Sequence, residues 1–257
     1  MKPIIIKVGG ALLQCDVGIE RLFNTLVKLN HAGWQPLLVH GGGVLIEQHL
    51  AAHGFSSEKR HGLRVTPAEQ IPVIAGALCG TANSALIAAA VASKLTPVGL
   101  CLADGGMTEA WPLDDDLGMV GVVAAADATL PQWLLSQGML PIVSSIAVDS
   151  DGNRLNVNAD QAATVLCQLL GAPLVLLSDV SGVLDGKGKL IPQLNATSAQ
   201  QLVQQGIIEG GMKVKVDAAL AAAKAINNTV LVASWRYPEQ LEGLVQGQPV
   251  GTQISPA

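Results

Sequence analysis

The feature that most restricts the fold of this chain is its first apolar run, Ile4–Val8, which one lysine interrupts and a glycine pair follows. Three consecutive isoleucines predict a strand that is buried on both faces, because no alternation marks a solvent-exposed side. Lys7 is unexpected in such a strand, since desolvating an ammonium group is costly unless an anion compensates it. Gly9 and Gly10 allow a sharp turn and let the backbone approach a ligand closely. The stretch therefore predicts a phosphate site, although a strand-end lysine that reaches solvent beside an ordinary turn also fits.

Further apolar runs repeat this plan along the chain. They are Leu37–Val39, Val98–Leu102, Ile142–Ile146, Leu174–Leu177 and Val230–Val232. Alanine-rich segments with helical spacing lie between them: Ile19–Leu29, Val44–His53, Ala68–Val91, Leu130–Gln137, Ala159–Leu170 and Met212–Ala225. This alternation predicts an α/β fold in three layers (αβα), with a mainly parallel central sheet covered by helices on both faces. Ser198–Gln201 also fits a capping box that opens a further short helix.

Two segments depart from the alternation and predict antiparallel hairpins laid on the parallel core. Val98–Val123 contains the turn residues Asp104–Gly106 and Asp114–Asp116, and Val148–Val157 turns at Asp151-Gly152. The aspartates at 114–116 could form a metal cluster, but their place between a proline and a glycine favours a solvated turn.

The composition limits the possible partners. With 257 residues the chain can form one large α/β domain or two lobes, whose boundary we expect near Gly171-Ala172-Pro173. A formal net charge of −5 argues against a nucleic-acid partner, which would need a basic face. The four cysteines form no Cys-x-x-Cys pair, so we expect small buried hydrophobes and no disulfide or zinc site. Apolar stretches are interrupted before they could span a bilayer, so we expect a soluble cytoplasmic protein with no membrane contact.

The carboxyl ends of the predicted strands are small or polar. They read Lys7–Gly10, His40–Gly43, Ser144-Ser145 and Ser178–Gly182. Because ligands bind beyond the carboxyl ends of strands in open parallel sheets, these ends predict one crevice of backbone N–H groups that holds phosphate oxygens. Neither Gly-x-x-x-x-Gly-Lys-Ser/Thr nor Gly-x-Gly-x-x-Gly occurs, which excludes a P-loop and the dinucleotide fingerprint.

Other interpretations of these motifs have less support. His40–Gly43 is similar to the oxyanion loop of some esterases, but the chain lacks the Gly-x-Ser-x-Gly elbow that such a hydrolase needs. His49 and His53 lie one helical turn apart, which suits a metal. Without the interposed glutamate of a zinc protease, two exposed histidines are the simpler interpretation. We therefore assign no metal ligand.

Three polar stretches add candidate site residues. Arg64 follows a charged stretch and is a candidate clamp for a substrate carboxylate, or else a surface arginine of a hairpin. Asn156, Asn158 and Asp160 occupy every second position before an apolar helix. One of them would suffice as its cap, which suggests a further function. Lys213–Lys215 sets lysine just inside a helix start, where it opposes the helix dipole and a nearby anion would explain it.

In order and spacing, these motifs resemble those of the amino acid kinase family. The matching segments are Lys7–Gly10, His40–Gly43, Gly62–Thr66, Asn156–Asp160, Ser178–Val183 and Gly211–Lys215. The resemblance covers nearly the whole chain and implies a single domain of the amino acid kinase fold over residues 1–257, with hairpins over the substrate side. Its N-terminal lobe (1–172) would hold the amino-acid substrate and the dimer contacts, and its C-terminal lobe (173–257) the nucleotide. The implied reaction transfers the γ-phosphoryl group of ATP to the side-chain carboxylate of N-acetyl-L-glutamate, in arginine biosynthesis.

The resemblance also implies a role for each matching residue. Lys7 would contact the γ-phosphoryl group, Lys215 would lie on the leaving side, and Asp160 would orient both lysines. The substrate-binding residues would be Gly42, Gly43, Arg64 and Asn156. The nucleotide-binding residues would be Gly9, Gly10, Asp179, Val180, Ser181, Gly182, Val183, Leu184, Ile207, Ile208 and Glu209.

The implied cofactor is Mg²⁺ carried by the phosphates of ATP, and the implied assembly is a homodimer. Arginine-inhibited hexamers of the family carry an extra helix before the first strand. This chain begins three residues before Ile4, so we expect no inhibition by arginine. Two alternatives stay open. One is another acyl-phosphate-forming member of the family, acting on carbamate, glutamate, aspartate or an aminoadipate derivative, and the other is a non-catalytic sensor of a nucleotide or amino acid.

Overall fold

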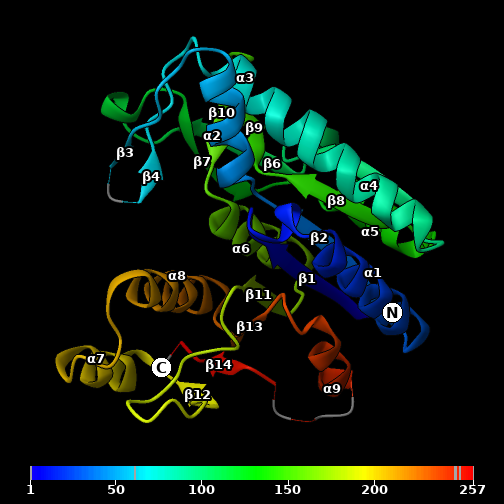
Figure 1. The fold of residues 1–257 in the computed structure, drawn as a ribbon. Helices are drawn as coiled ribbons and strands as arrows, with labels where there is room; N and C mark the ends of the chain where they lie inside the picture. Colours follow the sequence, from blue (N-terminus) through cyan, green and yellow to red (C-terminus); the bar gives the residue numbers. More distant parts are fainter. Residues whose placement is uncertain (1, 61, 246–247, 249, 257) are drawn as a thin grey trace.

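A mostly parallel sheet runs through the middle of the molecule (Figure 1). The computed structural model describes residues 2–60, 62–245, 248 and 250–256. Within these residues the strand order is β12-β14-β13-β11-β1-β2-β8-β5, and β13 and β14 are the one antiparallel pair. The strand bounds are β1 Lys2–Val8, β2 Trp34–His40, β5 Pro97–Cys101, β8 Leu140–Ser144, β11 Leu174–Ser178, β12 Gln193–Leu194, β13 Val230–Ser234 and β14 Thr252–Ile254. The prediction of an α/β fold with a mainly parallel sheet is confirmed.

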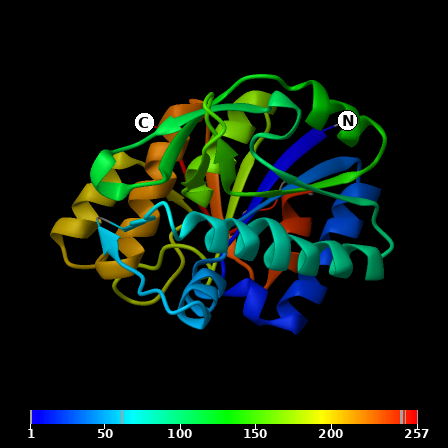
Figure 2. The ribbon, with the colours of Figure 1, turned by 90° about the horizontal axis from the view of Figure 1, so that it is seen from above.

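Helices cover both faces of this sheet (Figure 2). The helix bounds are α1 Asp16–His31, α2 Gly43–Ala52, α3 Ile71–Ala75, α4 Asn83–Ala92, α5 Thr129–Ser136, α6 Ala159–Leu170, α7 Ala196–Gln204, α8 Gly210–Ile226 and α9 Glu242–Val245. Ile4, Ile6 and Val8 of β1 enter the core cluster shared with α1 and α4, whereas Ile5 enters the cluster shared with α6 and α8. Lys7 points to the same face as Ile5, because side chains alternate along a strand. The lysine is therefore directed toward the layer that contains α6.

A smaller sheet contains the predicted hairpins. Its strand order is β6-β7-β10-β9, with bounds β6 Thr108–Pro112, β7 Val120–Ala125, β9 Ile146–Val148 and β10 Arg154–Val157. β6 pairs antiparallel with β7, and β9 pairs antiparallel with β10 through a turn in which Gly152 has a φ of 84°. Both hairpins are thus confirmed, and a parallel pairing of β7 with β10 joins them. The predicted strand Ile142–Ile146 is divided, because the chain passes from one sheet to the other at Ser145.

The predicted helix Ala68–Val91 is a helical segment with an irregular middle. It consists of α3, a π-helical turn over Gly76–Ala82, and α4. Over Ile71–Ala92 it is long and apolar enough to cross a membrane by length and composition alone. The expectation that every apolar stretch is too short was therefore wrong for this segment. A core helix of a globular protein can have the same length and composition, and 44% of this segment's most apolar window is buried.

Two local predictions are corrected by the structure. The side chain of Asn195 accepts the N–H of Ser198, and Ser198 Oγ accepts the N–H of Asn195. Asn195 is therefore the first residue of the capping box and Ser198 its inner member, because an asparagine at this position is a strong N-cap. Cys79, in the π-helical turn, is exposed, and Cys15 and Cys101 are only partly buried, which corrects the expectation that all four cysteines are buried; Cys167 alone among them is buried. The aspartate run forms the expected turn, in which Asp114 accepts the N–H of Asp116.

Candidate active site

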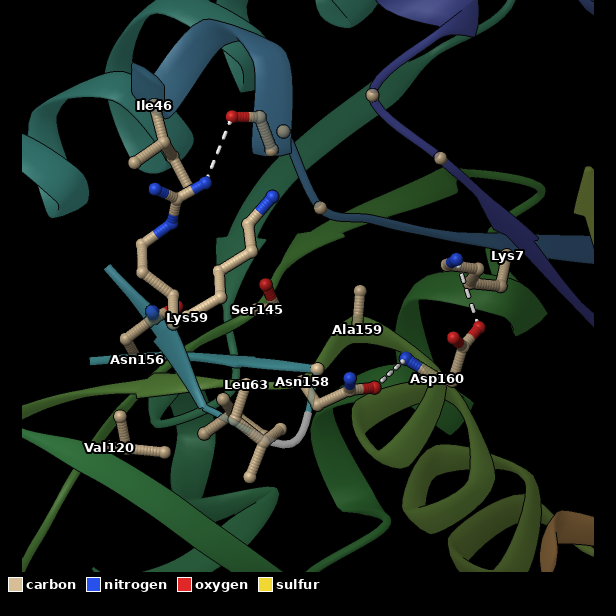
Figure 3. A pocket seen from close by; sticks show the side chains of 18 residues that line it. Lys7, Ile46, Lys59, Leu63, Val120, Ser145, Asn156, Asn158, Ala159 and Asp160 are labelled. Atoms are coloured by element: carbon tan, nitrogen blue, oxygen red, sulfur yellow. Dashed lines mark hydrogen bonds and ion pairs between the residues drawn. The ribbon is translucent and has the colours of Figure 1, made fainter. Parts of the chain in front are cut away.

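The ends of β1 and β2, the segment around Arg64, the strand β10 and the start of α6 bring eight of the eighteen predicted site residues together (Figure 3). They line a cavity of about 260 Å³. Its lining includes Lys7, Gly9, Gly10, Gly42, Gly43, Arg64, Asn156 and Asp160. The positions predicted for substrate binding therefore meet two of the three predicted catalytic residues in one place.

Lys7 faces a carboxylate at the start of α6. Its Nζ lies 2.9 Å from Asp160 Oδ1, a contact that Figure 3 marks. Asn158 is the N-cap of α6, and its side-chain oxygen accepts the N–H groups of Asp160 at 2.8 Å and Gln161 at 3.3 Å. Because Asn158 caps the helix, the Asp160 carboxylate is left to pair with Lys7. The pair supplies the anion that a lysine in this strand requires.

The glycine turns after β1 and β2 pack against each other. A Cβ atom on Gly10 would lie 2.9 Å from the backbone nitrogen of Gly43, and one on Gly42 would lie 2.8 Å from Leu78 Cδ2. A larger residue at Gly10 would therefore force the two turns apart, and one at Gly42 would displace the side chain of Leu78. α2 begins at Gly43, so the N–H groups of its first turn have no partner within the helix and carry the positive end of its dipole. The turn can hold an anionic oxygen at this end of the cavity.

Arg64 is fixed beside the second glycine turn, with 8% of the residue exposed. Its Nη2 donates to the carbonyl oxygen of Gly43 and to Glu47 Oε1, both at 3.1 Å, and its Nη1 donates to Ser57 Oγ. A planar guanidinium held on several sides suits recognition of a carboxylate. Arg64 is therefore not a surface arginine, and its role as a carboxylate clamp stays a prediction.

Asn156 is linked to the chain segment that carries Arg64. Its Nδ2 donates to Thr66 Oγ1 at 3.1 Å, and the Thr66 hydroxyl donates to the carbonyl oxygen of Arg64, also at 3.1 Å. Through Thr66, the amide of Asn156 is therefore held in position relative to the backbone of Arg64.

Glu47 and Lys59 belong to this site and were not predicted. Lys59 lies in β3 (Lys59–Arg60), which pairs with β4 (Leu63–Arg64), and its Nζ lies 2.9 Å from Glu47 Oε1. Hydrogen bonds from Lys59 and then from Arg64 hold the pKa of the Glu47 carboxyl below its usual value. A charged run before Arg64 was the signal for Lys59 in the sequence. Nothing in the sequence marks Glu47, because the fold alone brings it to both cations.

A larger cavity of about 670 Å³ adjoins the first. Residues that line both cavities are Lys7, Gly9, Gly10, Lys59 and Asp160. The larger cavity is also lined by Asp179, which follows β11, and by Lys215 from the start of α8. The two lysines predicted to converge therefore line the same cavity.

Each of these lysines has its own counterion. Lys215 Nζ donates to Asp179 Oδ1, and this hydrogen bond holds the pKa of the Asp179 carboxyl below its usual value. Lys7 pairs with Asp160. The predicted arrangement, in which Asp160 orients both lysines, thus requires Lys215 to leave Asp179.

The predicted nucleotide-binding residues are divided between the cavity and the core. Gly9, Gly10 and Asp179 line the larger cavity. The other predicted nucleotide-binding residues, all of which the structure describes, do not line this cavity. They are Val180, Ser181, Gly182, Val183, Leu184, Ile207, Ile208 and Glu209. Val183 and Ile208 are buried in the core that α6 and α8 share. Their side chains therefore support the segments, and their backbone is the part that could face a ligand.

The carboxylates of the larger cavity do not form a metal cluster. In the part of the chain that the structure describes, no group of three or more His, Cys, Asp or Glu side chains could hold a metal ion. Asp160 and Asp179 each face a lysine. This donor set fits Mg²⁺ that is held by the phosphate oxygens of a ligand and by water.

Comparison with known proteins shows what this chain is similar to. Residues 2–234 match the sequence model of the amino acid kinase family. The acetylglutamate kinase of Shewanella oneidensis is 56% identical over 253 residues, which cover 98% of this chain and 97% of that protein. The crystal structure of smu.665 from Streptococcus mutans UA159 has a TM-score of 0.82 at 26% identity and covers 99% of both chains. Carbamate kinase from Giardia lamblia bound to AMP-PNP has a TM-score of 0.69 at 20% identity, covering 100% of this chain and 99% of that one, which shows a shared fold.

Proposed function

This chain belongs to the amino acid kinase family, and on that premise we propose how its residues carry out the acetylglutamate kinase reaction. The enzyme transfers the γ-phosphoryl group of ATP to the side-chain carboxylate of N-acetyl-L-glutamate, giving N-acetyl-L-glutamyl 5-phosphate and ADP. One observation carries the proposed assignment of residues. Lys7 lines both the cavity that contains Lys215 and the adjoining cavity that contains Arg64. Phosphate donor and acid acceptor would therefore meet at Lys7.

The acceptor carboxylate needs no general base. A free side-chain carboxyl of this kind has a pKa of about 4.3 and is already ionised at neutral pH. Asp160, which pairs with Lys7, is therefore assigned to positioning and not to proton transfer. The barrier is the repulsion between an anion and a polyphosphate. Catalysis then consists of positioning, together with positive charge at the phosphoryl oxygens.

Lys7 and Lys215 are the cations that we assign to the phosphoryl group. Lys7 would contact the γ-phosphoryl oxygens, and Lys215 would stabilise charge on the leaving side. A nucleotide phosphate in the larger cavity would replace Asp179 as the partner of Lys215. A movement of α8 toward α6 would then let Asp160 orient both ammonium groups.

We assign the smaller cavity to N-acetyl-L-glutamate. The guanidinium of Arg64 matches the α-carboxylate, and the amide of Asn156 matches the acetylamino group. The N–H groups of Gly42 and Gly43, at the start of α2, would then face the carboxylate that is phosphorylated. Each polar group of the acid would have a partner of matching chemistry.

We assign the larger cavity to ATP, with Gly9 and Gly10 beside its phosphates. The segments Asp179–Leu184 and Ile207–Glu209 would border the nucleotide. Both follow β11 and belong to the proposed C-terminal lobe (173–257), which adjoins the N-terminal lobe (1–172) where β11 pairs with β1. Closure of the two lobes would bring these segments toward the phosphates.

Mg²⁺ is assigned to the nucleotide and to no protein side chain. When bound, it neutralises phosphate charge and so reduces the repulsion of the acceptor. Lys7, Lys215 and the glycine turns act on the same phosphate oxygens from the protein side.

We also expect a cytoplasmic homodimer that arginine does not inhibit. Light scattering would give the mass of the assembly, and titration of the active enzyme with arginine would test the absence of inhibition.

The decisive experiment measures ADP release with and without N-acetyl-L-glutamate. Glutamate, aspartate, carbamate and an N-acylated aminoadipate serve as comparison acids, and hydroxylamine traps an acyl phosphate as its hydroxamate. We expect ADP and hydroxamate together with N-acetyl-L-glutamate. Preference for another acid would assign the chain to a different reaction of the family. Tight ATP binding without ADP formation would identify a sensor.

A further inference from the structure

We propose that His40 and Asn83 form a buried positioning pair that fixes the glycine turn Gly41–Gly43, and with it the N–H groups that face the acyl acceptor. The inference rests on the proposed assignment of the smaller cavity to N-acetyl-L-glutamate. Gly41, Gly42 and Gly43 line that cavity, whereas His40 lies behind them as the last residue of β2.

Hydrogen bonds determine which nitrogen of the imidazole carries the proton. His40 Nδ1 lies 3.0 Å from the carbonyl oxygen of Gly41, and Nε2 lies 3.1 Å from Asn83 Nδ2. A carbonyl oxygen can only accept, so Nδ1 carries the hydrogen and donates it to Gly41. Nε2 then accepts from the amide of Asn83, which also donates to the carbonyl oxygen of Ile142 at 2.9 Å. Asn83 thereby fixes the ring between β2 and β8.

Burial keeps this ring neutral. His40 is fully buried and Asn83 is 3% exposed. Desolvation lowers the pKa of His40 to about 4, and the hydrogen bond to Gly41 opposes this in part. The neutral ring has one donor and one acceptor nitrogen, which is the form that both hydrogen bonds require.

The surrounding backbone is shaped to admit the pair. A Cβ atom on Gly99 of β5 would overlap Asn83 Oδ1, so this position leaves room for the asparagine side chain. Asn83 is the first residue of α4 and follows the π-helical turn that carries Leu78. Leu78 packs against Gly42 on the other side of the turn. The same helical segment therefore positions the glycine turn twice, once by packing and once through His40.

A substitution that removes the hydrogen bond to Gly41 releases the orientation of that peptide. Because misplacement of a reacting group by about 1 Å can reduce rates by about 10²-fold, small shifts of the turn have measurable effects. The N–H groups of the turn belong to the proposed site for N-acetyl-L-glutamate, so the substitution should change KM for this acid and not KM for ATP.

Two variants of His40 separate the two ring nitrogens. In His40→Asn the amide nitrogen is as many bonds from Cα as Nδ1, so the donor to Gly41 is kept. In His40→Gln the amide lies where Nε2 was, and that donor is lost. We expect KM for N-acetyl-L-glutamate to rise by about 10-fold or more in His40→Gln and in Asn83→Leu, and clearly less in His40→Asn, with KM for ATP unchanged. Thr25→Val, which removes a buried hydrogen bond within α1, controls for lost stability and should leave KM unchanged.

Nitrogen NMR of the ligand-free protein tests the pair independently of activity. We expect His40 in the Nδ1–H form in the unmodified protein, and a loss of that preference in Asn83→Leu. An Nε2–H ring in the unmodified protein, or equal KM changes in His40→Asn and His40→Gln, would overturn the inference. If the protein did not phosphorylate N-acetyl-L-glutamate, the proposed function would fail while the tautomer measurement still decided the role of Asn83.

Discussion

Lys215 forms an ion pair with the carboxylate of Asp179, the residue that follows β11. Lys7 forms a second pair with Asp160 in the same cavity. Two ammonium groups in one cavity would repel each other, so the two carboxylates balance the charge before a nucleotide is present. The phosphates of ATP would compete with both carboxylates. Variants of these four residues therefore separate the roles of charge and of position.

Lys7→Ala and Lys215→Ala should each reduce kcat by roughly 10²–10³-fold, the effect of losing one donor that stabilises transition-state charge. Michaelis constants should change much less. Lys213→Ala is a matched control on the same helix, because Lys213 pairs with the exposed carboxylate of Asp217. Steady-state kinetics of the three variants checks the assignment. Normal turnover in either of the first two variants would remove that lysine from the chemistry.

Asp160→Asn should lower kcat by about 10²-fold through misplacement of Lys7, whose counterion it removes. No proton is transferred in the proposed reaction, so the pH dependence of the residual activity should match that of the unmodified enzyme. A pH–rate profile of both proteins is the measurement. Loss of the acid limb in the variant would instead identify Asp160 as a general base.

Arg64→Ala should raise KM for N-acetyl-L-glutamate by about 10–10²-fold, since a hydrogen bond to a charged group contributes about 1.5–3 kcal/mol. KM for ATP should change little, because Arg64 lines the smaller cavity. Arg21→Ala serves as the control, since Arg21 pairs with Glu239 on the surface. Equal increases in both Michaelis constants would place Arg64 outside the acid pocket.

The parts of the fold that follow from local chemistry could be predicted from the sequence. The helix Ala159–Leu170 was predicted with its observed bounds, because polar residues that can cap a helix stand directly before an apolar pattern with helical spacing. The strand at Ile4–Val8 and its lysine were found because both depend on neighbouring residues alone.

Contacts between distant segments could not be predicted in this way. The pairing of Lys215 with Asp179 joins residues 36 apart and depends on how α8 packs against α6 and β13. Glu47 meets Lys59 and Arg64 because α2 and the β3–β4 hairpin pack together, which no periodicity encodes. The π-helical turn at Gly76–Ala82 was also missed, since apolar spacing does not distinguish it from an α-helix.

Asp179→Asn should lower stability near neutral pH, and the difference from the unmodified protein should shrink in acid. The pKa of Asp179 is lowered in the folded state by Lys215. The ion pair therefore stabilises the folded protein at pH values above the ordinary aspartate pKa of about 3.9. This contribution is lost as the pH falls through the lowered pKa that Asp179 has in the folded state. Urea unfolding at several pH values measures the difference. A difference that stays constant from neutral pH to well below 4 would contradict this account.

Gly10→Ala should destabilise the protein, whereas Gly9→Ala should not. A Cβ on Gly10 would lie 2.9 Å from the backbone nitrogen of Gly43, and a backbone atom cannot rotate away. A Cβ on Gly9 meets nothing nearer than Lys7 Nζ at 4.0 Å. Neither glycine has a left-handed φ, so the comparison isolates the steric contact between the two turns. Overpacking of this kind costs about 1–3 kcal/mol, which thermal unfolding of both variants would detect. Equal Tm values for the two variants would show that the turns are not in close contact.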